Sequence, residues 1–270
     1  MRGKVFLAMA ILGAMLLGSP GWSAQEAKKE PPPTPDPLKV LQQMCDFLKA
    51  QKQFAFQAEV VDDRVYQDGK KLQYAFGLQL FARRPDRLKV MAAGDLENKE
   101  LFYDGKSLTL YEKPNKLYAA MAAPGSIDTA LDKAHKDYGL RVALADLACA
   151  NLGDLVKAGV QHALYVGRHR VHGIPCHHLA FDRDDLHIQI WVQTGNQPLP
   201  RKVVMTQKRL PHSPTWSAYI ARWNLTAKLP DKLFVFKPPP GAQQIKFLAA
   251  KPKAAAPAAA PQPKKEGEKP

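Results

Sequence analysis

Residues 54–80 read FAFQAEVVDDRVYQDGKKLQYAFGLQL, and this stretch decides the fold. Apolar and polar side chains alternate on both sides of Asp68-Gly69, which is the period-two pattern of half-buried strands. The Asp-Gly pair predicts a type I′ turn, which joins antiparallel strands. The alternating apolar residues are Phe54, Phe56, Ala58 and Val60 before the turn and Leu72, Tyr74, Phe76, Leu78 and Leu80 after it. A long antiparallel hairpin with one buried face is therefore expected.

Further strand patterns extend this hairpin along the chain. Pro85 begins a short strand that carries Leu88 and Val90, and Asp104-Gly105 marks a second hairpin turn. Residues 186–193 alternate cleanly between apolar and polar side chains, as expected for a strand with one buried face. Other predicted strands are residues 101–103, 107–111, 117–118, 160–168, 176–181, 201–208 and 216–225.

Two segments have the spacing of amphipathic helices. Asp36-Pro37 supplies an N-cap and a first-turn proline for a helix that runs to about Ala50. Ser126 and Gly139 bracket a second helical stripe, and further helical turns are expected in residues 142–157. A long sheet must curl, and the helices need an apolar surface to cover. We predict a mainly β (α+β) fold, a strongly curved antiparallel sheet or half-open β-barrel with a helical lid.

The N-terminal 24 residues have the pattern of a secretory signal peptide. Arg2 and Lys4 precede an apolar run over residues 5–17, and Ser23-Ala24 offers a cleavage site. Cleavage after Ser23 is the alternative position. An uncleaved anchor is the other reading, but the run is shorter than the roughly 20 apolar residues of a membrane span. We expect a periplasmic protein exported through a cleaved signal peptide.

Low-complexity segments flank the folded part of the chain. Residues 25–36 form a proline-rich linker, and residues 251–270 form an Ala/Pro/Lys tail. Neither composition can bury a core, so both segments are predicted to be disordered. The tail has a second interpretation as a contact for peptidoglycan or anionic lipid. Residues 37–250 are the predicted β domain.

The chain is strongly basic, with a formal net charge of +14. Removing Arg2 and Lys4 with the signal peptide leaves +12 on the mature chain. In the envelope such a charge favours contact with an anionic membrane surface or with an acidic envelope protein or polymer. Nucleic acid is excluded as a partner because export separates the protein from it and no nucleic-acid-binding motif is present.

Cys45, Cys149 and Cys176 are the three cysteines of the chain. An oxidising periplasm permits one disulfide and one free thiol, and we favour the pair Cys149–Cys176. Three small buried thiols are the alternative, which the sequence leaves open.

Several motifs resemble known envelope proteins. The runs RPDRLKV (residues 84–90) and ELFYDGKSLTLY (residues 100–111) are similar to the early hairpins of the periplasmic lipoprotein carriers LolA and LolB. FVFKPPPGA (residues 234–242) resembles the last strand and proline turn of that superfamily. Residues 165–181 and 191–200 look like a family of predicted periplasmic proteins of unknown function. The resemblance covers about residues 37–248.

This resemblance implies a half-open β-barrel with a helical lid above an apolar cavity, which in the carriers holds acyl chains. The resemblance implies no catalytic residues for this chain. The helical insertion at residues 126–159 departs from the pattern of the carriers, so lipoprotein transport itself is not carried over. The cavity rests on the resemblance, because periodicity does not distinguish a hollow interior from a filled one.

Ten apolar strand residues are candidates for lining the cavity. Any β domain must also bury such side chains, so packing in the core is the competing explanation for each of them. The candidates are Phe54, Phe56, Tyr74, Phe76, Leu78, Leu80, Leu88, Val90, Trp191 and Trp223.

Neither a metal site nor a catalytic site is predicted. Strand geometry sends His177 and His178 to opposite faces, and the cluster around them lacks the spacing of a zinc site. Nucleophile motifs such as G-x-S-x-G and S-x-x-K are absent. Asp182, Asp184 and Asp185 lie beside Arg183 at a predicted hairpin tip, where solvated charge explains them.

We therefore predict a non-enzymatic periplasmic binding or carrier protein for a lipid, an acyl chain or another apolar ligand, with no cofactor. The alternative is a protein-interaction or sensor module that uses the same fold without a bound lipid. Ligand identity, partner protein and oligomeric state stay open.

Overall fold

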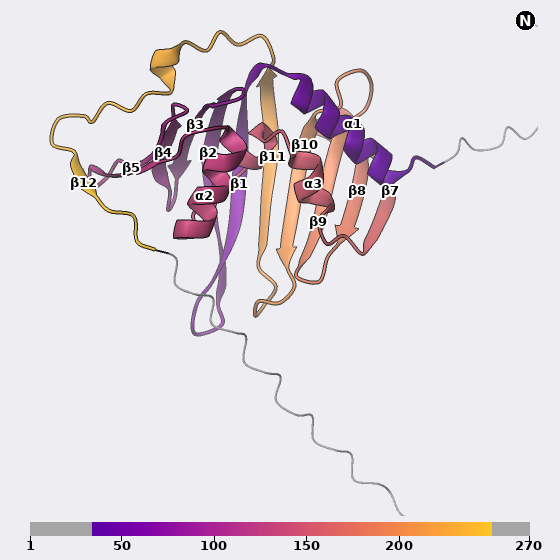
Figure 1. Cartoon of the computed structure of the whole chain (residues 1–270). Helices are drawn as coiled ribbons and strands as arrows, with labels where there is room; N and C mark the ends of the chain where they lie inside the picture. The colour runs from indigo at the N-terminus through magenta and orange to yellow at the C-terminus, as the bar shows by residue number, and fades with distance from the viewer. Residues whose placement is uncertain (1–33, 250–270) are drawn as a thin grey trace, which may run out of the picture. The chain divides into compact units, whose positions relative to one another are not determined.

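The computed structural model describes residues 34–249, in which twelve strands form one sheet (Figure 1). The strand order is β12-β6-β5-β4-β3-β2-β1-β11-β10-β9-β8-β7. The strands are β1 Gln53–Val65, β2 Lys71–Arg83, β3 Arg87–Gly94, β4 Asn98–Tyr103, β5 Ser107–Glu112, β6 Leu117–Ala122, β7 His162–Val171, β8 Ile174–Asp182, β9 Leu186–Gln193, β10 Pro200–Gln207, β11 Thr215–Asn224 and β12 Gln243–Ile245. Neighbours are antiparallel except for β12 and β6, which are parallel. The curved sheet is open between β12 and β7, which confirms the predicted fold class without closure of a barrel.

The helices cover one face of this sheet, which we call the inner face (Figure 1). They are α1 Pro37–Ala50, α2 Ile127–Tyr138, the 3₁₀ helix η1 Ala145–Ala148 and α3 Leu152–Lys157. A second 3₁₀ helix, η2 Asp231–Leu233, does not belong to this layer. The helix predicted from Asp36-Pro37 is confirmed, because the Asp36 carboxylate accepts hydrogen bonds from the amides of Leu38 and Lys39 at 2.8 and 3.3 Å. Its apolar stripe includes Leu41, Met44 and Leu48, which are all fully buried against the sheet.

The hairpin of β1 and β2 pairs thirteen residues of each strand in unbroken register. Its turn differs from the predicted type I′ turn. Gly69 has a φ of +81°, but Asp68 keeps a negative φ, whereas type I′ requires a positive φ at both positions. The amide of Tyr66 donates to the carbonyl of Lys70 at 2.9 Å, so the loop is longer than two residues and needs only Gly69 in the left-handed region.

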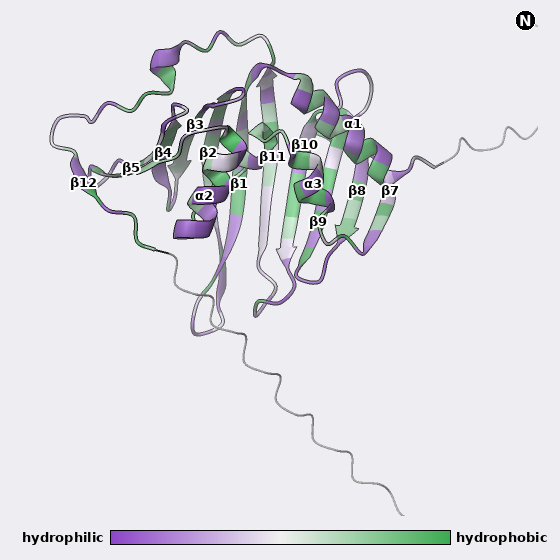
Figure 2. Cartoon of the chain, viewed as in Figure 1, coloured by the Kyte–Doolittle hydropathy of each residue, from purple (hydrophilic) through white to green (hydrophobic). Residues whose placement is uncertain are grey.

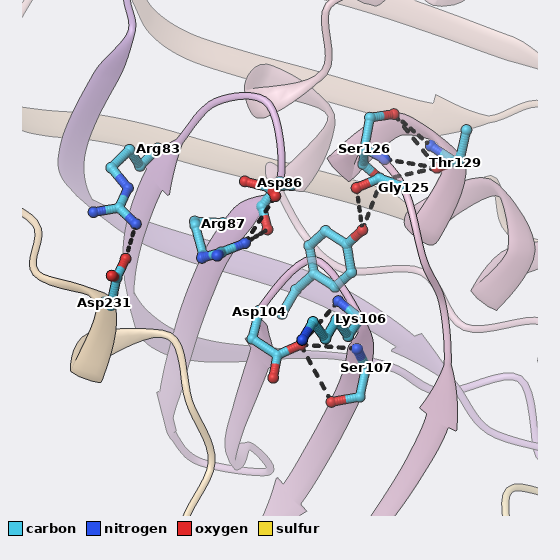
Figure 3. Close-up of polar contacts among 11 residues, drawn as sticks. Arg83, Asp86, Arg87, Asp104, Lys106, Ser107, Gly125, Ser126, Thr129 and Asp231 are labelled. Carbon is cyan, nitrogen blue, oxygen red and sulfur yellow. Dashed lines mark hydrogen bonds and ion pairs between the residues drawn. The ribbon is translucent and has the colours of Figure 1, made fainter.

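Helix α2 is anchored at its N-terminus (Figure 3). The Ser126 hydroxyl accepts a hydrogen bond from the Thr129 amide at 3.2 Å, and the Thr129 hydroxyl accepts one from the Ser126 amide at 3.0 Å. This reciprocal pair is a capping box. The buried Tyr103 on β4 donates its hydroxyl to the carbonyl of Gly125 at 2.7 Å. The first turn of α2 is therefore tied to the sheet, and the helix ends at Gly139 as predicted.

A single arginine at the end of β2 connects the helices to the sheet. The guanidinium of Arg84 donates to the carbonyls of Leu48 and Leu147, both at 3.3 Å, and to that of Ala148. These carbonyls lie in the last turns of α1 and η1, where helix carbonyls lack the regular donor four residues on; that of Leu48 also accepts a hydrogen bond from the Gln51 amide at 3.1 Å. The Arg84 guanidinium also lies 5.7 Å from the Phe54 ring centre. Burial lowers the pKa of Arg84, although an arginine remains charged in proteins.

The chain after β11 forms a strap that crosses the other face of the sheet, the outer face, and reaches the sheet edge at β12 (Figure 1). Beyond β12, Phe247 packs on Tyr138 of α2 with ring centres 4.9 Å apart. Phe234 is fully buried in a small core of its own. The Phe236 ring packs among Phe102, Tyr111 and Tyr118 with ring centres 5.0–5.4 Å apart. Residues 234–242, which resemble a last strand, are not in a strand here; the strap pairs with the sheet only at β12.

The predicted signal peptide, most of the proline-rich linker and the predicted tail lie outside the described residues. Among residues 34–249, no helix has both the length and the apolar character needed to cross a membrane.

The Arg84 contacts predict a large loss of stability in Arg84→Met. This variant leaves three helix-end carbonyls without their charged donor, and we expect the free energy of unfolding to fall by about 3 kcal/mol in urea titrations. The control is Arg83→Met, which removes an exposed ion pair with Asp231 and a bond to the Leu229 carbonyl. Its expected cost is about 1 kcal/mol. Equal losses in the two variants would contradict a special role for Arg84.

Candidate functional site

Most of the space between the helices and the inner face is filled by side chains. The exposed fractions of Phe54 and Phe56 of β1 are 0% and 2%. The Trp223 ring packs on both of them, with ring centres 5.6 and 4.6 Å away. Together with α1 and η1 they form a continuous core. Hydrophobic residues occur along strands β8–β10, which the helices partly cover (Figure 2). Strand β9 alternates the buried Ile188, Ile190 and Val192 with less buried neighbours, as expected of a sheet with one buried face.

A pocket remains where the covering segment is a loop instead of a helix. It has a volume of about 200 Å³ and lies between β2–β5 and the loop of residues 140–143, which joins α2 to η1. We call this loop the roof. The floor is formed by Phe76, Leu78, Val90, Ala92, Leu101 and Leu110. Floor and roof are predominantly apolar, so the pocket is suited to a hydrocarbon group.

The roof is bounded by two residues in the left-handed region. Gly139 has a φ of +67° and Leu144 a φ of +59°. The left-handed region costs a leucine roughly 1–2 kcal/mol, whereas glycine adopts it freely. Between these residues, Leu140 and Val142 are packed against the main core. The roof has no regular secondary structure and is held by these apolar contacts and by two backbone hydrogen bonds at its ends, from the Leu140 amide to the Ala134 carbonyl and from the Ala145 amide to the Val142 carbonyl.

Three charged residues, Glu97, Lys99 and Arg141, are among those that line the pocket. Lys99 lies with its ammonium 3.0 Å from the Glu97 carboxylate, and Arg64 approaches the same carboxylate at 3.8 Å. Arg141 of the roof is exposed and lies 3.1 Å from Nε2 of His135. The interior of the pocket contains no group arranged for acid–base or nucleophilic chemistry.

A second hollow of about 230 Å³ lies on the outer face of β1–β3, at Gly77, which has no side chain to fill it. Its lining is more polar and includes Gln57, Gln79 and Lys113 besides Met91 and Ala93.

The ten sequence candidates separate into three groups. Phe76, Leu78 and Val90 line the pocket. Six others are on the inner side of the sheet but outside the pocket. Four of them, Phe54, Phe56, Leu80 and Leu88, are buried in the core, and Trp223 is packed against it. The sixth, Tyr74, has its hydroxyl 2.6 Å from that of Tyr66. Trp191 is on the outer face, because its neighbours Ile190 and Val192 point into the core.

Sequence reasoning missed the roof and half of the floor. Ala92, Leu101 and Leu110 follow the same alternation as the nominated residues and were identifiable from it. The roof residues carry no such pattern, since a loop has no period. Only the helix stop at Gly139 marks where the roof begins.

The predicted disulfide Cys149–Cys176 is wrong in this structure, in which all three cysteines are free and buried. Cys149 belongs to the core beneath the helices. On β8, Leu179 and Phe181 point into that core, so Cys176 points to the outer face. The sheet lies between the two thiols. Burial raises the pKa of Cys45 to about 11 and that of Cys149 to about 12.

The histidines predicted not to form a metal site lie on both faces. Nδ1 of His177 is 3.0 Å from the Tyr165 hydroxyl on the inner side. On the outer face His178 stacks on Trp191 with ring centres 3.9 Å apart, and its Nδ1 is 3.0 Å from Nδ1 of His169. Burial lowers the pKa of His178, and the nearby His169 and Lys202 act in the same direction. Within residues 34–249 no cluster of three metal-ligating side chains occurs.

Comparison with known proteins gives a family match over most of the chain. The profile of the DUF2092 family, described as predicted periplasmic protein, matches residues 38–248. This match confirms the predicted family and the predicted periplasmic localisation. No curated protein matches the sequence.

Solved structures of similar fold have low sequence identity to this chain. A LolA superfamily protein from Nitrosomonas europaea is 12% identical with a TM-score of 0.39, over 74% of this chain and 97% of that one. The Mycobacterium tuberculosis lipoprotein LppX is 13% identical with a TM-score of 0.45, over 71% and 96%. MucB in the MucA/MucB complex of Pseudomonas aeruginosa is 15% identical with a TM-score of 0.41, over 75% and 62%.

The burial of the cysteines predicts their reactivity. The native protein is expected to resist alkylation by iodoacetamide at neutral pH, because buried thiols of raised pKa form little thiolate. After denaturation without reductant, mass spectrometry is expected to count three alkylated cysteines. A count of one would establish a disulfide and contradict the structure.

Proposed function

Because this chain belongs to the DUF2092 family of predicted periplasmic proteins, we propose that it is a non-enzymatic binding protein that holds an acyl chain or similar apolar group beneath the roof. The coarser description, a periplasmic binding or interaction module, follows from the family and the fold. The observation that carries the proposal is the apolar pocket between β2–β5 and residues 140–143.

The energetic basis of binding is burial of hydrocarbon. Each methylene removed from water contributes about 0.8 kcal/mol, and no polar chemistry is required. The lining supports this because nine of its twelve residues are apolar and the charged ones are Glu97, Lys99 and Arg141. A ligand with a polar head would place its chain among Leu78, Val90 and their neighbours and its head in solvent.

The size of the pocket implies that the roof moves. At about 200 Å³ it is smaller than the roughly 300–1,000 Å³ of typical small-molecule sites. It admits part of a chain in its present form, and displacement of the roof admits more. Movement there breaks two backbone hydrogen bonds at helix ends, from the Leu140 amide to the Ala134 carbonyl and from the Ala145 amide to the Val142 carbonyl, both 3.2 Å long. The first turn of α2 is held more firmly, by Tyr103 and the capping box. Gly139 and Leu144 are the positions that absorb the change.

A second candidate function is supported by the free edge of the sheet. Strand β7 is ten residues long and pairs only with β8. Leu164 and Val166 on it are 60% and 41% exposed. A long edge with exposed apolar side chains is suited to pairing with an extended segment of a partner protein. This function predicts a partner that crosslinks to β7 and binds equally well with or without added lipid.

Filling the pocket tests the first proposal. Ala92→Phe places a ring in the floor, and we expect the affinity for a fluorescent fatty acid to fall roughly 30-fold, because two or three methylenes lose their site. The readout is ligand fluorescence titrated with the purified mature chain.

The matched control is Ala93→Phe, the next residue along β3. Its side chain points to the outer face and enters the second hollow. Wild-type affinity in this variant is the expected result. Loss of binding in Ala93→Phe alone would move the site to the outer face, and absence of fatty-acid binding in the parent protein would refute the proposal. Thermal unfolding of both variants establishes that they are folded.

A further inference from the structure

The charged side chains of β7–β11 are divided unevenly between the two ends of these strands. Residues 160–224, all of which the structure describes, contain eight Arg or Lys residues and three Asp residues. The three carboxylates are at or beside the turn after β8, where Asp182, Asp184 and Asp185 approach three of the cations at 3.5–3.9 Å. These cations are Arg183, Lys208 and Arg209. Charge at this end is therefore balanced.

The other five cations lie at the opposite end of the same strands. They are Arg168, Arg170, Arg201, Lys202 and Arg222. None of the five forms an ion pair with a carboxylate of residues 34–249. We call this group the basic end. It contains five positive charges and, within residues 160–224, no negative one.

The strand registers bring these five residues to the same end of the sheet but not to the same face, because Arg168 pairs with the inward-pointing His177 and Lys202 pairs with the outward-pointing Trp191. Arg170 is opposite Pro175, Cys176 is opposite Gln193, and Val192 is opposite Pro200, so the turns after β7 and β9 lie at the same end. Trp223 at the end of β11 donates its indole N–H to the Pro200 carbonyl at 3.2 Å. The arrowheads of β8 and β10 point away from this end (Figure 1). Five strands about 4.8 Å apart make the basic end roughly 19 Å wide.

The basic end is accessible and is accompanied by aromatic rings. Arg168, Arg170 and Arg222 are exposed. The Lys202 ammonium lies 4.8 Å from the Trp191 ring centre and 4.6 Å from that of Tyr219, and both rings are half-buried. Aromatic rings next to basic side chains are characteristic of protein surfaces that contact lipid headgroups.

We propose that the basic end docks this protein on the surface of an anionic phospholipid bilayer. Unpaired cations spread over about 19 Å match the dispersed phosphates of a membrane surface. Docking is independent of ligand binding in the pocket, which lies under a different part of the sheet.

The test is co-sedimentation of the full mature chain with vesicles of phosphatidylcholine containing about 30% phosphatidylglycerol, against vesicles of phosphatidylcholine alone. Arg168→Gln/Arg170→Gln is compared with Lys208→Gln/Arg209→Gln, which removes the same charge at the balanced end. Each basic residue at such a surface contributes about 1 kcal/mol, so the first variant is expected to bind roughly 20- to 30-fold more weakly. The second is expected to stay within about twofold of the parent.

Three outcomes would overturn the proposal. Equal weakening of both variants would show that net charge alone governs binding, and unchanged binding of both would place the contact elsewhere in the chain. Failure of the parent to bind these vesicles, with retention on an acidic polypeptide column that requires Arg168 and Arg170, would assign the basic end to a protein partner. If the proposal is correct, binding of the parent protein to the anionic vesicles is also lost at high salt, because exposed charges are screened.

Discussion

The contact between Arg84 and the ends of two helices is the constraint on which the rest of this molecule depends. A helix layer on a sheet needs a fixed position, and apolar packing alone leaves it free to slide. Here one guanidinium donates to carbonyls of Leu48, Leu147 and Ala148, so α1 and η1 end at the same cation. The donor comes from the sheet itself, at the end of β2. The roof leads into η1 through Leu144, so this contact holds the element that follows one end of the roof.

The inner face is filled where a helix covers it and hollow where the covering segment is a loop. Helix α1 brings large side chains every third or fourth residue onto the sheet, and Phe54, Phe56 and Trp223 fill the remaining space. The roof has only four residues, so few side chains reach the floor of β2–β5. The same difference makes the roof the part of the covering layer that is easiest to displace. The short loop of the roof therefore accounts both for the pocket and for the place where a ligand can enter it.

The two edges of the sheet, and the two halves of its outer face, differ in whether other parts of the chain cover them. The edge at β6 is covered by β12, and the strap buries Phe234 and Phe236 on the outer face of the N-terminal strands. The C-terminal strands have no such cover, and their edge at β7 is free. The basic end and the exposed Leu164 belong to this uncovered half. The half that encloses the pocket and the half that carries the proposed docking surfaces are therefore distinct.

The sequence by itself determined the local structure: the helix that begins at Asp36-Pro37, the capped helix from Ser126 to Gly139, and the antiparallel hairpins. Each depends on interactions between residues close in the chain, such as caps, turns and the alternation of strand faces. Tertiary structure alone decided which apolar faces stay partly uncovered, because alternation is identical beside a helix and beside a loop. It also separated Cys149 from Cys176 by the thickness of the sheet and paired β12 with β6, since contacts between distant segments leave no local pattern. For the same reason three of the ten candidate residues line the pocket, while the others pack in the core or lie elsewhere on the sheet.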